Sequence, residues 1–214
     1  MTEAENGLKR LFSGLYSSQT PFDTLPVDGF KPVTAVWRPR LAAVLVPIVM
    51  DPEPALVLTV RSHALKSHAG QVAFPGGGRE TRESFPVVTA LREAEEEVGI
   101  DSDAVEIMGL TRCFDTITAY RIVPVVGVVR RALQLRPCPR EVLTVFRLPL
   151  TEALDPSSYR LHQVRHRQRQ YEVWSMRSAR WPIWGATAAI LAHLSQLADG
   201  RQVSTSPAAA LPRR

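Results

Sequence analysis

Cysteine is scarce in this chain of 214 residues, which contains only Cys113 and Cys138. Two cysteines in a chain of this length indicate neither a disulfide framework nor a zinc site, so we expect a reducing compartment, the cytoplasm. Long apolar runs are also missing, because the longest, Leu41 to Met50, is interrupted by Pro47. That run is too short to span a bilayer, and the first residues, MTEAENGLKRLF, contain no apolar signal segment. We therefore expect no membrane partner.

A concentrated basic stripe is absent too. The formal net charge is +5, but the basic residues are spread along the chain and are not interleaved with aromatic residues. Because such a stripe is typical of nucleic-acid-binding proteins, we expect no nucleic-acid partner. A net positive surface suits a small polyanionic substrate at least as well.

The composition, 45% hydrophobic and 22% charged, is typical of one globular domain with tails. We expect an N-terminal helix and connector over residues 1–35, a main domain over 36–198 and a disordered tail over 199–214. Apolar patterns and turn signals predict strands at 41–50, 55–61, 105–112, 122–130, 143–148, 159–163 and 170–176, and a final helix from about Pro182 to Leu197. This pattern indicates an α+β or α/β fold.

The most informative segment is 74–100, FPGGGRETRESFPVVTALREAEEEVGI. On a helix each residue advances about 100°, which places the carboxylates of Glu93, Glu96 and Glu97 on one face. Apolar residues fall on the opposite face, and Gly99 follows as a stop signal. These apolar residues are Val87, Leu91, Ala94 and Val98.

Such crowding of carboxylates destabilises a helix unless something offsets it. Like charges four residues apart repel, and carboxylates in the last turn oppose the helix dipole. A hard divalent cation such as Mg²⁺ would relieve both effects. The alternative for an acidic run taken alone is a solvated helix face, and Arg92 fits either interpretation as a partner for Glu96.

Together with Pro75-Gly-Gly-Gly78, this helix resembles the Nudix box, G-x5-E-x7-R-E-U-x-E-E-x-G-U with U aliphatic. Ala94 is a small residue at the first aliphatic position. The first glutamate of the box would fall at Ser84, whereas Glu83 stands one position earlier. This departure leaves the role of Glu83 open.

A second block, LTVRSHALKSHAGQVAFPGG over 58–77, resembles the signature of coenzyme A pyrophosphatases within the Nudix superfamily. That signature has the form L-L-T-x-R-[SA]-x3-R-x3-G-x3-F-P-G-G. Val57 replaces the first leucine, and Lys66 replaces the second arginine with its charge kept. The same subfamily has the longer spacing before the helix, with an acid where Glu83 stands.

The resemblance implies a Nudix fold, a mixed curved sheet sandwiched between helices, and hydrolysis of the pyrophosphate bond of coenzyme A or an acyl derivative. Mg²⁺ or Mn²⁺ would be held by Glu93, Glu96 and Glu97, while Arg92 orients them. The general base is left open between Glu93 and Glu141. The residues implied to bind substrate are Arg61, Lys66, Gly70, Gly76 and Gly77.

Two other functions remain open. One is a Nudix hydrolase acting on another nucleoside diphosphate derivative, such as ADP-ribose. The other is a Nudix-fold protein that binds a nucleotide without cleaving it, although the three helix glutamates are all retained. A homodimer is left open as well.

Two further groups have alternative interpretations. A basic cluster is either a solvated hairpin edge or a clamp for phosphate groups. It comprises Arg160, Arg165, His166, Arg167 and Arg169. We expect Trp181 and Trp184 to pack in the core at the head of the last helix.

Overall fold

The computed structural model describes residues 3–30, 38–166, 169–177 and 180–200. Part of the predicted connector, Arg167 of the basic cluster and the tail from residue 201 onward lie outside these residues. The helices are α1 (Glu3–Ser13), α2 (Val87–Val98), α3 (Leu150–Ala153) and α4 (Gly185–Ala198). The strands are β1 (Val27–Gly29), β2 (Arg40–Val49), β3 (Ala55–Arg61), β4 (Val72–Ala73), β5 (Gly76–Gly78), β6 (Val105–Leu110), β7 (Cys113–Asp115), β8 (Tyr120–Val129), β9 (Val142–Pro149), β10 (Tyr159–His166), β11 (Arg169–Met176) and β12 (Ile183–Trp184).

A mixed sheet of nine strands forms the centre of the described chain. Its main path is β1-β7-β8-β2-β3-β4, while β5 pairs with β2, β6 with β8 and β9 with β3. The longest pairing is parallel and runs from Arg40 opposite Tyr120 to Val49 opposite Val129. Strands β2 and β3 pair only near their shared turn, so β5 can pair with the other half of β2.

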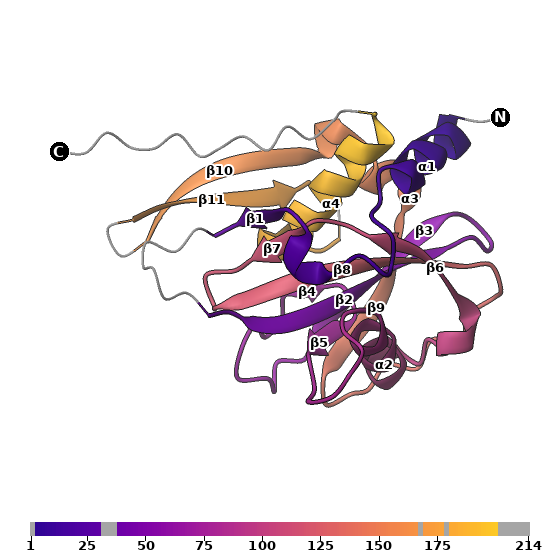
Figure 1. Ribbon diagram of the computed structural model, residues 1–214, viewed down its shortest axis with the longest axis horizontal. Coiled ribbons are helices and arrows are strands. Elements are labelled where there is room, and N and C mark those ends of the chain that lie inside the picture. The colour runs from indigo at the N-terminus through magenta and orange to yellow at the C-terminus, as the bar shows by residue number, and fades with distance from the viewer. Residues whose placement is uncertain (1–2, 31–37, 167–168, 178–179, 201–214) are drawn as a thin grey trace.

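Both faces of this sheet are covered, which explains the continuous apolar runs of β2 and β3. Leu45 and Val49 pack in the core layer with α2, whereas Val46 and Ile48 pack in the layer that includes α1 and α4. Figure 1 shows α2 on one side of the sheet and α1 and α4 on the other. The predicted mixed sheet between helices is therefore confirmed.

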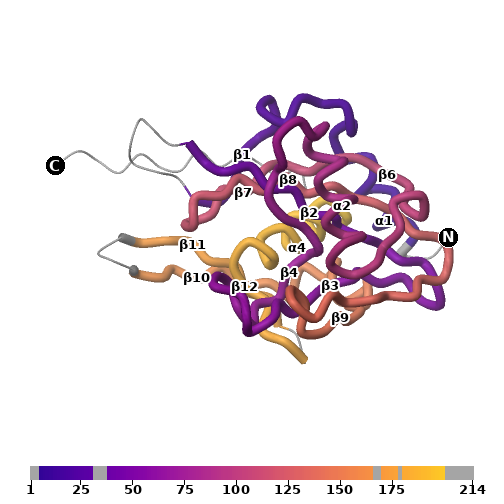
Figure 2. The backbone as a smooth tube through the Cα atoms, turned by 90° about the horizontal axis from the view of Figure 1, so that it is seen from below, coloured from indigo at the N-terminus to yellow at the C-terminus, as the bar shows by residue number. Residues whose placement is uncertain are grey.

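A second sheet consists of β10, β11 and β12, with α4 packed against β11. Strands β10 and β11 form a hairpin that contains Arg160, Arg165, His166 and Arg169 of the basic cluster, and this hairpin projects from the rest of the molecule (Figures 1 and 2). In this hairpin Arg160 donates to the carbonyls of Ser157 and Tyr159, at 3.0 and 2.9 Å. Within the described residues, no helix is long and apolar enough to cross a membrane.

The head of the last helix differs from the prediction. Helix α4 begins at Gly185 because Ile183 and Trp184 pair with β11 as a short strand. Successive side chains of a strand point to opposite faces, so Ile183 is buried while Trp184 is 49% exposed. The expectation that Trp184 packs in the core is wrong, whereas Trp181 does pack against the core.

Candidate functional site

Helix α2 positions the acidic cluster, which consists of Glu93, Glu96 and Glu97. Its predicted apolar stripe packs on the sheet, with Ala94 and Val98 fully buried. The helix ends at Gly99, whose φ of 72° places it in the left-handed region. Its N–H donates to the carbonyls of Ala94 and Glu95, so the last turn closes where the sequence predicts a stop. Glu95 points into solvent, outside the cluster.

The glycine run next to α2 forms the short strand β5. Gly76, Gly77 and Gly78 pair with Val44, Ala43 and Ala42 of β2. A side chain at Gly76 would overlap the backbone of β2, and one at Gly77 would overlap the carboxylate of Glu93. Glycine at position 76 therefore lets β5 lie close to β2, and glycine at position 77 lets the carboxylate of Glu93 lie against the β5 backbone.

Glu97 is the most deeply buried of the three helix glutamates, with only 3% of its side chain exposed. Its carboxylate accepts a hydrogen bond from the N–H of Gly76 at 3.1 Å and lies 3.6 Å from Nη1 of Arg61. Burial raises the pKa of Glu97 to about 7, although these two partners act in the opposite direction. The negative charges of Glu93 and Glu141 raise it further.

Glu93 and Glu96 lie in different surroundings. The carboxylate of Glu93 is 2.8 Å from Nη2 of Arg92, and burial is the main reason that the pKa of Glu93 is raised. Glu96 is 61% exposed and 3.3 Å from Nη1 of Arg92, the predicted pair four residues apart. The structure thus brings Glu93 and Glu97 together against β5 and leaves Glu96 at the solvent rim.

Arg92 connects these carboxylates with two that precede the helix. The Nε of Arg92 donates to the carboxylate of Glu83 at 2.6 Å, and the carboxylate of Glu80 lies 3.9 Å from Nη1. The Nη2 of Arg92 donates to the carbonyl of Gly78 at 3.3 Å. The bond to Glu83 is the main reason that the pKa of Arg92 is raised. The same bond lowers the pKa of Glu83 to about 2. Glu83, whose role the sequence leaves open, is therefore an ionised partner of Arg92.

The residues implied to bind substrate occupy different positions. Arg61 ends β3 and faces Glu97, whereas Lys66 is exposed in the loop between β3 and β4. Gly70 closes this loop: its φ is 72° and its N–H donates to the carbonyl of Arg61 at 3.0 Å. Arg61 is thus a partner of the acidic cluster, whereas the side chain of Lys66 faces solvent.

Glu141 lies at the end of a loop that is tied to the site. The N–H groups of Arg136 and Cys138 donate to the carbonyls of Val98 and Glu97, both at 2.8 Å. The carbonyl of Glu141 accepts from the N–H of Ser62 at 2.8 Å, next to Arg61. These hydrogen bonds hold the loop at both ends, beside the last turn of α2 and beside the end of β3.

The donor set has the chemistry of a site for a hard divalent cation, since it consists of carboxylates and strand backbone. As the described side chains stand, no three His, Cys, Asp or Glu residues converge in a way that could hold a metal ion. Arginine nitrogens instead lie against Glu93 and Glu97. The raised pKa values of both glutamates nevertheless show that these contacts do not fully offset burial.

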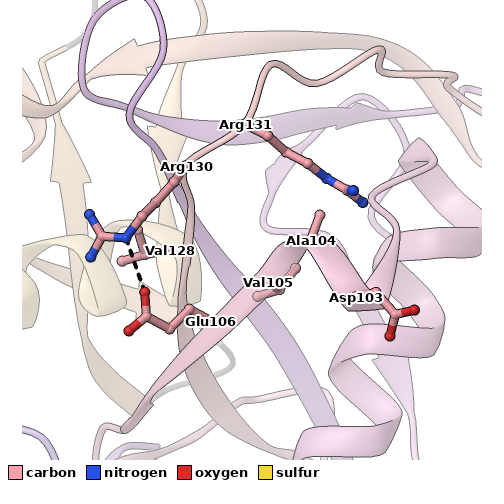
Figure 3. Close-up of a pocket in the computed structure, with 7 residues that line it drawn as sticks. All are labelled: Asp103, Ala104, Val105, Glu106, Val128, Arg130 and Arg131. Carbon is pink, nitrogen blue, oxygen red and sulfur yellow. Dashed lines mark hydrogen bonds and ion pairs between the residues drawn. The ribbon is translucent and has the colours of Figure 1, made fainter.

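A cavity of about 300 Å³ lies elsewhere, between the start of β6 and the end of β8 (Figure 3). Its two arginines already have acidic partners. Arg130 is 3.1 Å from Glu106, and Arg131 is 2.7 Å from Asp101. None of the predicted site residues lines this cavity, so it contributes nothing to the acidic cluster.

Comparison with known proteins agrees with the family resemblance that the sequence motifs indicate. The NUDIX domain model matches residues 39–176. The chain is 43% identical to "Uncharacterized Nudix hydrolase NudL" of Escherichia coli strain K12 over 183 residues, 81% of this chain and 95% of that protein. It is 44% identical to the protein of the same name from Photorhabdus laumondii over 157 residues, 73% of this chain and 84% of that protein.

Among solved structures, the NUDIX domain of Shewanella oneidensis NrtR, crystallised with ADP ribose, is 15% identical with a TM-score of 0.48. The match covers 78% of this chain and 92% of that one.

The burial of Glu97 predicts an unusual dependence of stability on pH. In the metal-free protein, the folded state keeps the Glu97 proton up to about pH 7, whereas the unfolded chain loses it near 4.5. The folded state therefore binds more protons in this window, and stability falls as pH rises through it. Between pH 4.5 and 7 this effect lowers the free energy of unfolding of the parent on the order of 3 kcal/mol, and Glu97→Gln should remove this decrease.

Urea unfolding with EDTA, measured from pH 4.5 to 8, tests this prediction. Glu95→Gln is the matched control, because Glu95 is exposed on the same helix, and it should keep the slope of the parent. A stability difference between parent and Glu97→Gln that does not vary with pH would contradict the prediction.

Proposed function

This chain belongs to the Nudix family, and from that premise we propose that it hydrolyses the pyrophosphate bond of coenzyme A or an acyl derivative. Water adds to one phosphorus, the bridging P–O bond breaks, and the bridging oxygen leaves with the other phosphate. The products are 3′,5′-ADP and 4′-phosphopantetheine or its acylated form. Hydrolysis of a nucleoside diphosphate derivative follows from the family, and the choice of coenzyme A is the finer part of the proposal.

The observation that carries this proposal is that the 58–77 segment forms one wall of the acidic site. Arg61, from the start of this segment, lies 3.6 Å from Glu97, and Gly76, from its end, donates to the same carboxylate. The loop between them presents Lys66 to solvent. A segment that resembles the coenzyme A signature therefore adjoins the carboxylates that would act on the diphosphate.

Nudix hydrolases generally need divalent metal ions, and Glu93, Glu96 and Glu97 are the residues that would hold Mg²⁺ or Mn²⁺ here. When bound, such an ion neutralises diphosphate charge and lowers the pKa of a water molecule. The chain's own groups position these donors. Arg92 holds Glu93, and the N–H of Gly76 holds Glu97. Because β5 covers this part of α2, Glu93 and Glu97 are shielded from bulk water.

For the general base we propose Glu141, with Glu93 as the alternative. The charge of Glu141 raises the pKa of both Glu93 and Glu97, so it acts on the same small region. Glu141 is exposed, whereas Glu93 already has Arg92 as a partner. An exposed carboxylate beside the cluster can exchange its proton with solvent after each turnover.

A substrate screen tests the proposed function. With Mg²⁺ or Mn²⁺, the purified protein should convert coenzyme A into 3′,5′-ADP and 4′-phosphopantetheine, identified by mass. EDTA should abolish turnover, and Glu97→Gln should lower it about 100-fold or more, while Glu95→Gln should remain near the parent. Preferred turnover of ADP-ribose, a dinucleoside polyphosphate or an oxidised nucleotide would replace the coenzyme A assignment. Binding of a nucleotide without turnover would indicate a sensor.

Substrate choice should depend on Lys66 more than on Arg61. Lys66→Ala should lower kcat/KM about tenfold more for coenzyme A than for ADP-ribose. An exposed lysine can contact the 3′-phosphate, which coenzyme A has and ADP-ribose lacks. Arg61→Ala should impair both substrates alike, because Arg61 is a partner of Glu97. Lys66→Arg is the conservative control. Equal losses on both substrates for Lys66→Ala would remove Lys66 from recognition of coenzyme A.

The kcat of the Glu141→Gln variant tests whether Glu141 is the general base. Glu141→Gln keeps the shape of the side chain and should lower kcat by about 10²-fold with little change in metal affinity, since a general base contributes roughly 10²- to 10⁴-fold. Steady-state kinetics and a metal titration measure the two quantities. A variant with the kcat of the parent would assign the role to Glu93.

A further inference from the structure

We propose that Thr89 is a positioning residue, which acts through Glu83 and Arg92 to hold the carboxylate of Glu93. This inference rests on the proposed hydrolase function, but the arrangement that it concerns is a chain of side-chain contacts among described residues. Thr89 lies in the first turn of α2 and is fully buried. It is neither one of the helix carboxylates nor part of the motif that they form.

The first contact fixes one oxygen of Glu83. The hydroxyl of Thr89 donates to Oε2 of Glu83 at 2.7 Å, and the backbone N–H of Glu80 donates to the same oxygen at 3.1 Å. Threonine is branched at Cβ and has few χ1 rotamers in a helix, so its hydroxyl has a defined direction. With Oε2 held by two donors, Oε1 is the oxygen that faces Arg92.

The second contact transmits this orientation to Arg92. Oε1 of Glu83 accepts from Nε of Arg92 at 2.6 Å. The guanidinium group is planar, so a fixed Nε also fixes the direction of Nη2. That nitrogen lies 2.8 Å from Oε1 of Glu93 and donates to the carbonyl of Gly78 at 3.3 Å. The order of contacts is Thr89, Glu83, Arg92 and Glu93.

In this protein Glu83 lies before α2 and not on it, so a contact is needed that fixes Glu83 relative to the helix. Helix geometry alone therefore does not fix Glu83 relative to Arg92, and one additional residue separates the two compared with the usual motif. Helix α2 also has no side-chain N-cap and no acidic residue in its first turn. The hydroxyl of Thr89 and Nε of Arg92 are the two side-chain donors of α2 that hold Glu83, and Thr89 is the one in the first turn of the helix.

The test compares Thr89→Val with Thr89→Ser in the full-length protein. Valine keeps the shape and lacks the donor, whereas serine keeps the donor. Thr89→Val should lower kcat about tenfold and raise the Mg²⁺ concentration for half-maximal activity, with KM changed less than about twofold. Thr89→Ser should restore most of this loss. Thr111→Val is the matched control, because Thr111 is also buried and its hydroxyl donates to a carbonyl, at 2.9 Å.

A second measurement does not depend on activity. The Nε–H signal of Arg92 in ¹H–¹⁵N NMR, assigned with Arg92→Lys, should exchange slowly with water in the parent and in Thr89→Ser, and faster in Thr89→Val. In a double-mutant cycle with Glu83→Gln, the two losses should not add, because Thr89 acts through Glu83.

The outcomes are distinct. Parent-like kcat and Nε–H exchange in Thr89→Val would overturn the inference, and so would equal losses in the valine, serine and Thr111→Val variants, which would indicate packing alone. If the parent cleaves no diphosphate substrate, the proposed function fails. The NMR comparison still decides whether Thr89 positions Arg92.

Discussion

Arg92 is the cation around which the acidic site is arranged. Its guanidinium group contacts Glu83, Glu93 and Glu96 and the carbonyl of Gly78. Without it, carboxylates from the helix and from the preceding segment would face one another in a partly buried region, where like charges repel strongly. The side chain of Arg92 therefore links α2 both to the end of β5 and to the segment that precedes the helix.

The fold and the centre of the site were predictable because their signals are local. Apolar runs predict most strands of the main sheet, and helical periodicity predicts that Ala94 and Val98 face the core. Gly99 marks the end of α2, as expected for a residue in the left-handed region. Residues 58–100 also contain two motifs with fixed spacing, so the family follows from their residues and the comparison confirms it.

The partners of these side chains were not predictable, because they come from pairing between distant segments. The glycine run forms a strand because β2 and β3 separate, which leaves the edge of β2 opposite β8 open along half of its length. Arg61 contacts Glu97 because β3 ends beside α2. The spacing of these residues in the sequence does not predict this contact. The exposure of Trp184 follows from its pairing with Ser175 of β11. The Glu83–Thr89 contact likewise depends on how the segment before α2 folds back onto the first turn of the helix.

The parallel pairing of β2 with β8 has a consequence for how the chain folds. It joins Arg40 to Tyr120, and almost the whole acidic site, from Arg61 to Gly99, lies within the loop that this pairing closes. Closing a loop of that length is slow compared with forming local structure. Helix α2, with 12 residues, is marginal on its own in water. During synthesis, a nascent chain that has not yet reached β8 therefore contains every helix carboxylate of the site but lacks the central strand that joins the two halves of the sheet.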